Sequence, residues 1–429
     1  MTYVQSDSRI ETDYDDSLAN QSISLGKRNF VLTFPNGTAI ANELALTFIL
    51  STSLRTEAIF TTDFNSQADG NFYFASTKQS FKLAIDELEP QKWILSNYNI
   101  STSGAKSVTC RVVFRPKTDR LVTTPRSDIV YAKFHLINHI NFLGERIVKN
   151  QRSFIDRLVL QSSEWRITID STEVTKANIE ALEDVGGYAL THVGLVERLD
   201  GQVFTSAELQ QILNDLGLFL RFVNGWALSP TLVEGYDQSD TIIWNLYAAP
   251  PTSEWRPHRQ QPHNWFNRFD AKLVLPVLYS EFDKLIRVPE WREALQRAVY
   301  WYIQGNLRNS GVDSSLILVH STLELLAWMY LVVDPTTKTI SKTKFKDSKG
   351  YNWTAKILDL LIACGISATV PVKLSELQKF HVTSGASNAP DCLNKLRNDL
   401  VHPEKQNAIT SGALMHEALY LALNYIELP

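Results

Sequence analysis

The sequence predicts an α+β protein of several domains: an N-terminal antiparallel β sandwich or barrel-like region, a mixed α/β middle region and a C-terminal all-α bundle. Three observations lead to this prediction. The chain has 429 residues, more than one hydrophobic core usually holds. Short apolar runs between Gly, Asn, Asp and Ser dominate the first third, as in antiparallel β proteins. Apolar residues at helical spacing dominate from about residue 269.

These patterns divide the chain into five parts. They are an acidic flexible N-terminus at 1–25, a β-rich domain at 26–163, a mixed α/β region at 164–250, a connection rich in Pro, Trp and Arg at 251–268, and a helical domain at 269–429.

The composition argues against several classes of protein. The net charge is −4, so any contact with nucleic acid requires a local basic patch. The three cysteines show no disulfide or metal-binding spacing, which predicts a reducing cytoplasm and no zinc site. We expect no secretory signal, since the first residues lack its basic and apolar regions. The apolar run Leu316–Val333 contains His320 and Glu324, which favours a buried helix over a membrane span.

Turn residues between apolar runs place the strands. Asn36-Gly37 separates Phe30–Phe34 from Ala45–Leu50, and an Asn-Gly pair tolerates the positive φ of a hairpin turn. Asp69-Gly70 precedes Phe72–Phe74 in the same way, and residues 108–114 alternate with period two.

The middle region mixes strand and helix patterns. Trp165–Ile169 reads as a strand and Arg198–Phe204 as a further hairpin, while apolar residues after Ser206 recur at helical spacing to about Phe222. Ser206 is a suitable N-cap for that helix, and Asn224-Gly225 can end it.

The connection that follows carries two candidate sites. His258 and His263 have no carboxylate or cysteine at ligand spacing, so we do not expect a metal. Arginines alternate with aromatic residues, a mixture that can stack bases and hold phosphates. It equally suits a domain interface, which we favour; the residues are Arg256, Arg259, Arg268, Trp255, Trp265 and Phe266.

Capping residues divide the helical domain. Pro289 opens one helix, Asp313 can cap the next, Asn388 can cap another, and apolar spacing indicates helices at Trp353–Cys364, 374–380 and Ala413–Ile426. The basic stretch between them reads as a solvated loop, and its Lys342, Lys344 and Lys346 are candidate RNA-binding residues.

The helix after Asn388 holds the strongest candidates for catalytic residues. Arg397 and His402 lie five positions apart, with Asn398 directly after the arginine. On an ideal helix Arg397 and His402 point about 140° apart. Pro403 disfavours helical backbone at His402, so we expect the helix to end there and His402 to turn toward Arg397.

Glu324 requires a partner if it is buried. His320 lies one turn before it, and Ser321 and Thr322 are nearby hydroxyls. A cation from another helix is the further alternative, with Arg397 the attractive candidate.

Arg397–His402 resembles the R-N-x-x-x-H form of the R-x(4–6)-H motif of HEPN domains. The segment 321–328 resembles the carboxylate-bearing helix of the ApeA-like HEPN branch, which also places a β-rich region first. The resemblance covers about 291–428 and implies an HEPN-like helical bundle that acts as a metal-independent endoribonuclease without cofactor.

In that reading His402 is the general base or acid, because an imidazole titrates near neutral pH. Arg397 holds the non-bridging phosphate oxygens, Asn398 orients the histidine or the ribose, and Glu324 fixes Arg397. The resemblance also implies a homodimer with a shared cleft, an RNA substrate such as tRNA, and a role in antiphage defence or toxin-like growth arrest. The N-terminal region would sense a trigger ligand.

Two alternatives stay open from the sequence. One is a non-catalytic HEPN-like dimerisation or nucleotide-binding module that carries a β-rich ligand-recognition domain. The other is a carbohydrate- or peptide-binding protein with an unrelated helical tail. The presence of both Arg397 and His402 favours the ribonuclease.

Overall fold

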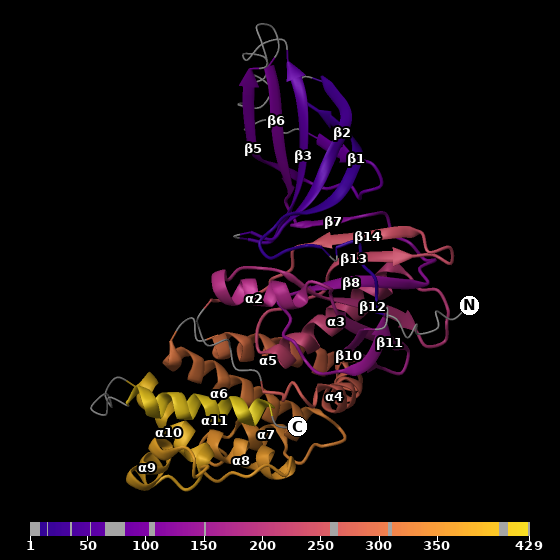
Figure 1. Ribbon diagram of the computed structural model, residues 1–429. Helices are drawn as coiled ribbons and strands as arrows, with labels where there is room; N and C mark the ends of the chain where they lie inside the picture. The colour runs from indigo at the N-terminus through magenta and orange to yellow at the C-terminus, as the bar shows by residue number, and fades with distance from the viewer. Residues whose placement is uncertain are drawn as a thin grey trace. The chain divides into compact units, whose positions relative to one another are not determined.

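A computed structural model describes residues 9–14, 16–34, 37–51, 53–64, 82–102, 108–149, 152–257, 265–307, 311–402 and 411–427. It confirms the α+β class, with antiparallel sheets first and helices after them (Figure 1). The chain forms two compact units. The first comprises 1–217, 228–261 and 267–280, and the second comprises 218–227, 262–266 and 281–429.

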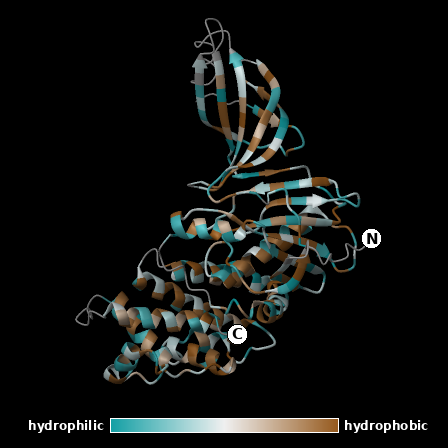
Figure 2. Cartoon of the chain, viewed as in Figure 1, coloured by the Kyte–Doolittle hydropathy of each residue, from teal (hydrophilic) through white to brown (hydrophobic). Residues whose placement is uncertain are grey.

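The first unit contains a six-stranded antiparallel sheet in the order β4-β1-β2-β3-β6-β5. Its strands are β1 Ile23–Thr33, β2 Ala39–Ile49, β3 Arg55–Phe64, β4 Lys82–Ile85, β5 Trp93–Thr102 and β6 Val108–Pro116. The predicted hairpin is confirmed, since Thr33 pairs with Ala39 across the turn and Gly37 has φ +85°. Polar and apolar residues mix along these strands (Figure 2). Asp69-Gly70 and Phe72–Phe74 lie outside the described residues.

The second sheet has eight strands in the order β7-β14-β13-β8-β12-β11-β10-β9. Its strands are β7 Arg120–Val122, β8 Tyr131–Ile137, β9 Glu145–Lys149, β10 Arg152–Gln161, β11 Trp165–Ser171, β12 Leu190–Arg198, β13 Thr231–Tyr236 and β14 Ile242–Ala248. The predicted division at 163/164 is therefore wrong, because this sheet contains strands from both sides of it. Strand alternation shows which residues face a core, but it does not show which strands share a sheet.

Two helices lie between these strands, α2 Thr175–Val185 and α3 Ser206–Asn224. Thr205, and not Ser206, caps α3: its Oγ1 accepts from the N–H of Glu208 at 3.1 Å, and Glu208 Oε2 accepts from the N–H of Thr205 at 2.8 Å. This reciprocal pair is a capping box. The expected hairpin at 198–204 is wrong, because β12 already pairs with β11 and β8, and Phe204 makes only an isolated bridge to Ile129.

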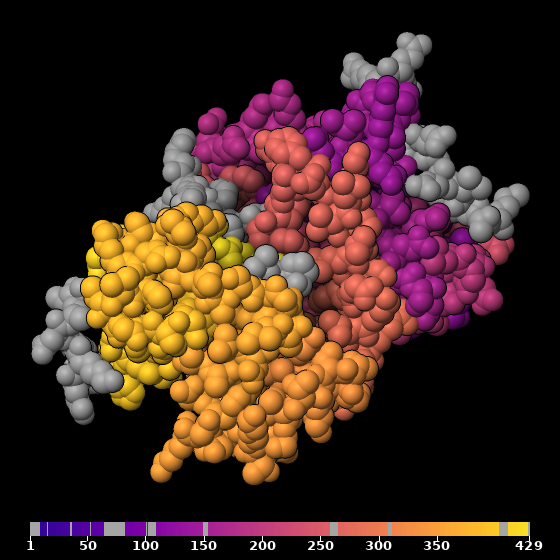
Figure 3. All heavy atoms as spheres, turned by 90° about the horizontal axis from the view of Figure 1, so that it is seen from below, coloured from indigo at the N-terminus to yellow at the C-terminus, as the bar shows by residue number. Residues whose placement is uncertain are grey.

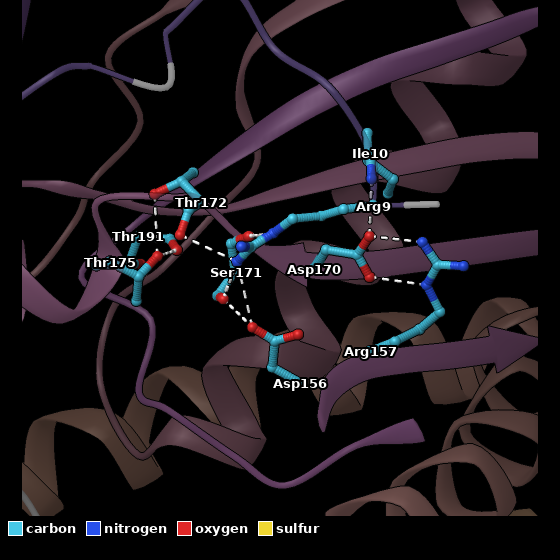
Figure 4. A network of polar contacts seen from close by, with 9 residues as sticks. All are labelled: Arg9, Ile10, Asp156, Arg157, Asp170, Ser171, Thr172, Thr175 and Thr191. Carbon is cyan, nitrogen blue, oxygen red and sulfur yellow. Dashed lines mark hydrogen bonds and ion pairs between the residues drawn. The ribbon is translucent and has the colours of Figure 1, made fainter. Parts of the chain in front are cut away.

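The N-terminal segment 9–14 is fixed to the second sheet, which corrects the prediction of a flexible N-terminus in these residues. Arg9 is 4% exposed, pairs with Asp156 at 3.2 Å and donates from Nε to the carbonyl of Ser171 at 2.7 Å (Figure 4). Thr12 contacts His135, and Tyr14 donates to Glu234 at 3.0 Å. Buried sheet residues thus satisfy the polar groups of a segment whose composition is typical of disorder.

An ion pair lies beside this segment. Arg157 of β10 donates from Nε and Nη2 to the two carboxylate oxygens of Asp170, at 2.8 and 2.7 Å, and both side chains are almost fully buried. Asp170 also accepts from the N–H of Ile10 at 2.9 Å. The same carboxylate therefore joins β10, β11 and the N-terminal segment (Figure 4).

The second unit contains most of the helices. These are the end of α3, part of α4 Ala271–Ile286, then α5 Pro289–Leu307, α6 Val312–Trp328, α7 Lys342–Lys346, α8 Trp353–Ala363, α9 Ser375–Ser384, α10 Ala389–Val401 and α11 Gly412–Glu427. A π-helical turn, Met329–Val333, continues α6. Gly311, and not Asp313, is the N-cap of α6, and the basic stretch forms the short helix α7 instead of a loop.

Helix α6 packs inside this unit, against α5, α8, α10 and α11. Together with its π turn, it is long and apolar enough to cross a membrane by length and composition. Half of its most apolar 18-residue window is buried. This burial agrees with the predicted buried helix.

Replacement of Asp170 by Asn is expected to lower the free energy of unfolding of the first unit by about 3–5 kcal/mol, because Arg157 keeps a buried charge without its carboxylate. Chemical denaturation measures this loss. The matched control is Asp200→Asn, which removes a similar bidentate contact with Arg198 at the surface and should change little. An equal effect of the two substitutions would contradict the role of the buried pair.

The stability of the second sheet should fall in acid through His135. Burial, aided by the charge of Lys133, lowers the pKa of His135 to about 4. Because the folded protein keeps this ring neutral while the unfolded chain protonates it near pH 6.5, the stabilisation is present above pH 6.5 and is lost as the pH falls to about 4. The loss is about 1.4 kcal/mol per pH unit. Hydrogen exchange of β8 and β12 should show a slope that is steeper by this amount in the wild type than in His135→Gln, because the buried His139 and His192, whose pKa values are also lowered, contribute in both.

Candidate functional site in the helical unit

Helix α10 begins and ends where the sequence predicts. The side chain of Asn388 accepts from the N–H of Asp391 at 2.9 Å, which caps the first turn. The helix ends at His402, whose backbone is extended (φ −112°, ψ 97°) and whose N–H donates to the carbonyl of Asn398 at 3.1 Å. The steric effect of Pro403 on the preceding residue accounts for this ending.

Arg397 is partly buried on α10, and its Nη1 donates to Oδ1 of Asn398 at 3.1 Å. Its Nε is buried and has no hydrogen-bond partner within the described part of the chain. No described carboxylate forms a salt bridge with it. Arg397 therefore keeps a positive charge that can attract an anion.

Glu324 does not pair with Arg397. Its Oε1 lies 2.7 Å from Nζ of Lys356 on α8. The hydroxyls of Ser321 and Thr322 instead donate to carbonyls of their own helix, one turn earlier. The predicted role of Glu324 in fixing Arg397 is thus wrong; the cation that approaches from another helix is Lys356.

His320 lies on α6, which packs against α10. Its ring stacks on the indole of Trp353 with centroids 3.7 Å apart and planes 12° apart. The Nε1–H of Trp353 donates to the carbonyl of His320 at 3.3 Å, which fixes the indole. Burial and the charge of Arg397 lower the pKa of His320 to about 3, against a hydrogen bond with Asn394 that favours the protonated ring. His320 is therefore neutral at pH 7.

The other predicted site residues are exposed. The side chain of His402 is exposed, and no described contact joins it to Arg397. Lys342, Lys344 and Lys346 project from α7, where Nζ of Lys344 lies 5.0 Å from the ring centre of Tyr351.

Phe345 of α7 is buried and packs this short helix against α6 and α8. Its ring contacts Trp328 of α6, and Nζ of Lys356 lies 4.5 Å from its centre. Trp328 lies eight residues after His320 on α6, about 12 Å along the helix. The segments that carry α7–α10, coloured orange to yellow, form part of the surface seen in Figure 3.

The structure adds three residues that the sequence analysis did not select: Trp353, Lys356 and Asn394. Lys356 lies three residues after Trp353, so the two share a face of α8. This spacing in the sequence could have indicated that both side chains point toward the same neighbouring helix. Among the described residues there is no group of three metal-ligating side chains. His258, His263 and Arg259 lie outside the described residues.

Fold and site together define a multidomain α+β protein whose helical unit carries an Arg397–His402 motif at a helix end. A family model described as YopA central domain matches residues 124–258, and one described as YopA C-terminal domain matches residues 288–429. The chain is 28% identical over 313 residues to "SPbeta prophage-derived uncharacterized protein YopA" of Bacillus subtilis (strain 168), which covers 72% of this chain and 67% of that protein. No solved structure matches the chain.

Each of the two matched regions corresponds to a set of consecutive helices and strands. The central match contains β8–β14 with α2 and α3, and begins at 124 instead of the predicted 164. The C-terminal match contains α5–α11 and therefore both Arg397 and His402.

Double-mutant cycles should separate the two possible partners of Glu324. We expect Glu324 and Lys356 to show a coupling free energy of about 0.5–1 kcal/mol, since one side chain is 42% exposed and solvent screens the pair. Glu324 and Arg397 should show a coupling near zero. Chemical denaturation of the single and double variants to Gln and Met measures both values, and a larger coupling for Arg397 would contradict the observed pairing.

Proposed function

We propose that this protein is a metal-independent endoribonuclease of HEPN type. The observation that carries the proposal is the structure of the Arg397–His402 motif: α10 ends at His402, and Arg397 keeps an unpaired Nε and no carboxylate among the described residues. An arginine without a carboxylate partner, on a helix that ends at a histidine, suits phosphoryl chemistry on RNA if the two side chains are brought together.

The chemistry follows from the side chains. The imidazole of His402 removes the proton from a ribose 2′-hydroxyl. The 2′-oxygen forms a bond to phosphorus and the bond to the 5′-oxygen breaks, while that oxygen takes a proton from an imidazolium or from water. Arg397 stabilises the charge on the non-bridging oxygens, and Asn398 holds one side of the guanidinium. The products are a 2′,3′-cyclic phosphate and a 5′-hydroxyl.

The wider setting of the proposal rests on the resemblance. Lys342, Lys344 and Lys346 would contact the RNA backbone electrostatically, and tRNA is the first substrate to test. Two copies would pair through the helical unit, with the N-terminal region responding to a trigger ligand in the cytoplasm. A role in antiphage defence or growth arrest follows from the same resemblance; the Bacillus relative is described as prophage-derived.

A non-catalytic HEPN-like dimerisation or nucleotide-binding module, with the β-rich region recognising a ligand, is the second candidate. One observation favours it: no described contact brings the imidazole of His402 to Arg397. Cleavage activity separates the two candidates.

The wild type should cleave total RNA or tRNA in EDTA and leave 2′,3′-cyclic phosphate ends. His402→Ala and Arg397→Ala should each slow cleavage by about 10²–10⁴-fold, because each removes a group that acts in the transition state. His381→Ala, at a partly exposed histidine of α9, is the matched control. Toxicity on overexpression is scored in parallel, so that an enzyme that requires a trigger is also detected. Equal cleavage by the wild type and His402→Ala, or neither cleavage nor toxicity, would exclude the ribonuclease.

A further inference from the structure

Two buried nitrogen atoms in the helical unit have no hydrogen-bond partner within the residues that the structure describes. One is Nε2 of His320 on α6, and the other is Nε of Arg397 on α10. Helices α6 and α10 pack together, and the two side chains are close enough for the guanidinium charge to act on the imidazole. Buried polar atoms of this kind are costly, because they lose water without gaining a partner.

The two atoms are complementary. The Nε of an arginine is always a donor. A neutral imidazole has one N–H and one lone pair, and we assign the N–H to the nitrogen that contacts Asn394, since that hydrogen bond favours the protonated ring. The lone pair is then on Nε2, on a ring whose plane is held by the stack on Trp353.

We propose that His320 is a positioning residue for Arg397, with Nε2 of His320 accepting a hydrogen bond from the Nε–H of Arg397. This bond would give a partner to both buried atoms. Its catalytic consequence rests on the proposed ribonuclease function, whereas the bond itself does not.

This bond gives the guanidinium two fixed points. Nη1 already donates to Asn398, and Nε would be held by His320. Nη2 and the outer proton of Nη1 are then free to contact two oxygens of one phosphate, the bidentate geometry that arginine favours. Glu324 cannot take this role, because Lys356 holds it. A neutral acceptor orients Arg397 without cancelling its charge, which a carboxylate would do.

The first test needs no substrate. NMR exchange of the Nε–H of Arg397 with water should be about tenfold faster or more in His320→Phe than in the wild type, because Phe keeps the stack on Trp353 but lacks an acceptor. His320→Gln, which restores an acceptor, should slow the exchange again. The matched control, His381→Phe, should leave it unchanged. Equal exchange in the wild type and His320→Phe would overturn the inference whether or not the protein cleaves RNA.

The second test applies to the catalytic consequence. If the protein cleaves RNA, His320→Phe should lower kcat about tenfold or more with a smaller change in KM, and His320→Gln should recover part of the loss. In an Arg397→Lys background, which lacks Nε, His320→Phe should have no further effect. A full additional loss in that background would show that His320 acts elsewhere. If Nε–H exchange is slow and depends on the acceptor but no RNA is cleaved, the hydrogen bond between His320 and Arg397 is supported and only the ribonuclease function is excluded.

Discussion

The ion pair between Glu324 and Lys356 joins helices α6 and α8 of the helical unit. Lys356 is nearly buried and lies on α8, and without a carboxylate its charge would be costly. Glu324 of α6 supplies this carboxylate. In consequence Glu324 is already paired, and no described carboxylate forms a salt bridge with Arg397. A different pairing, with Arg397, would have produced a neutral, structural cluster in place of a site that can attract an anion.

Local features of this unit were predictable because neighbouring residues determine them. The cap at Asn388 and the end of α10 at His402 depend on side chains and a proline within a few positions of one another. The partner of Glu324 is 32 residues away in sequence, and helical spacing alone does not reveal how α6 and α8 are rotated toward each other. His320 was noticed only as a neighbour of Glu324, since its stack on Trp353 is equally long-range.

In the first unit, too, local sequence patterns predict a hairpin but not which distant strands pair. The hairpin of β1 and β2 follows from its turn, whereas the eight-stranded sheet joins strands from residue 120 to residue 248 and has no local signature. The acidic N-terminal residues predict disorder by composition. Yet Arg9 is buried and bonded to β11, and Glu234 accepts from Tyr14 and Tyr236. Composition describes a segment alone, and it carries no information about buried partners far along the chain.

The geometry of α10 sets a condition on the proposed chemistry. Arg397 is partly buried and bonded to Asn398, whereas His402 is the exposed C-cap residue of the helix. Arg397 is thus placed by its surroundings, and His402 has the freedom of a helix end. In the proposed mechanism, a histidine in that position acts only when something brings it to the phosphate that Arg397 would hold. RNA itself can do so by binding between them, and so can a second copy of the helical unit, whose own α10 presents another exposed histidine. In both cases the arginine is preorganised and the imidazole is supplied on assembly, so binding of substrate or partner, and not the chemical step, would control activity.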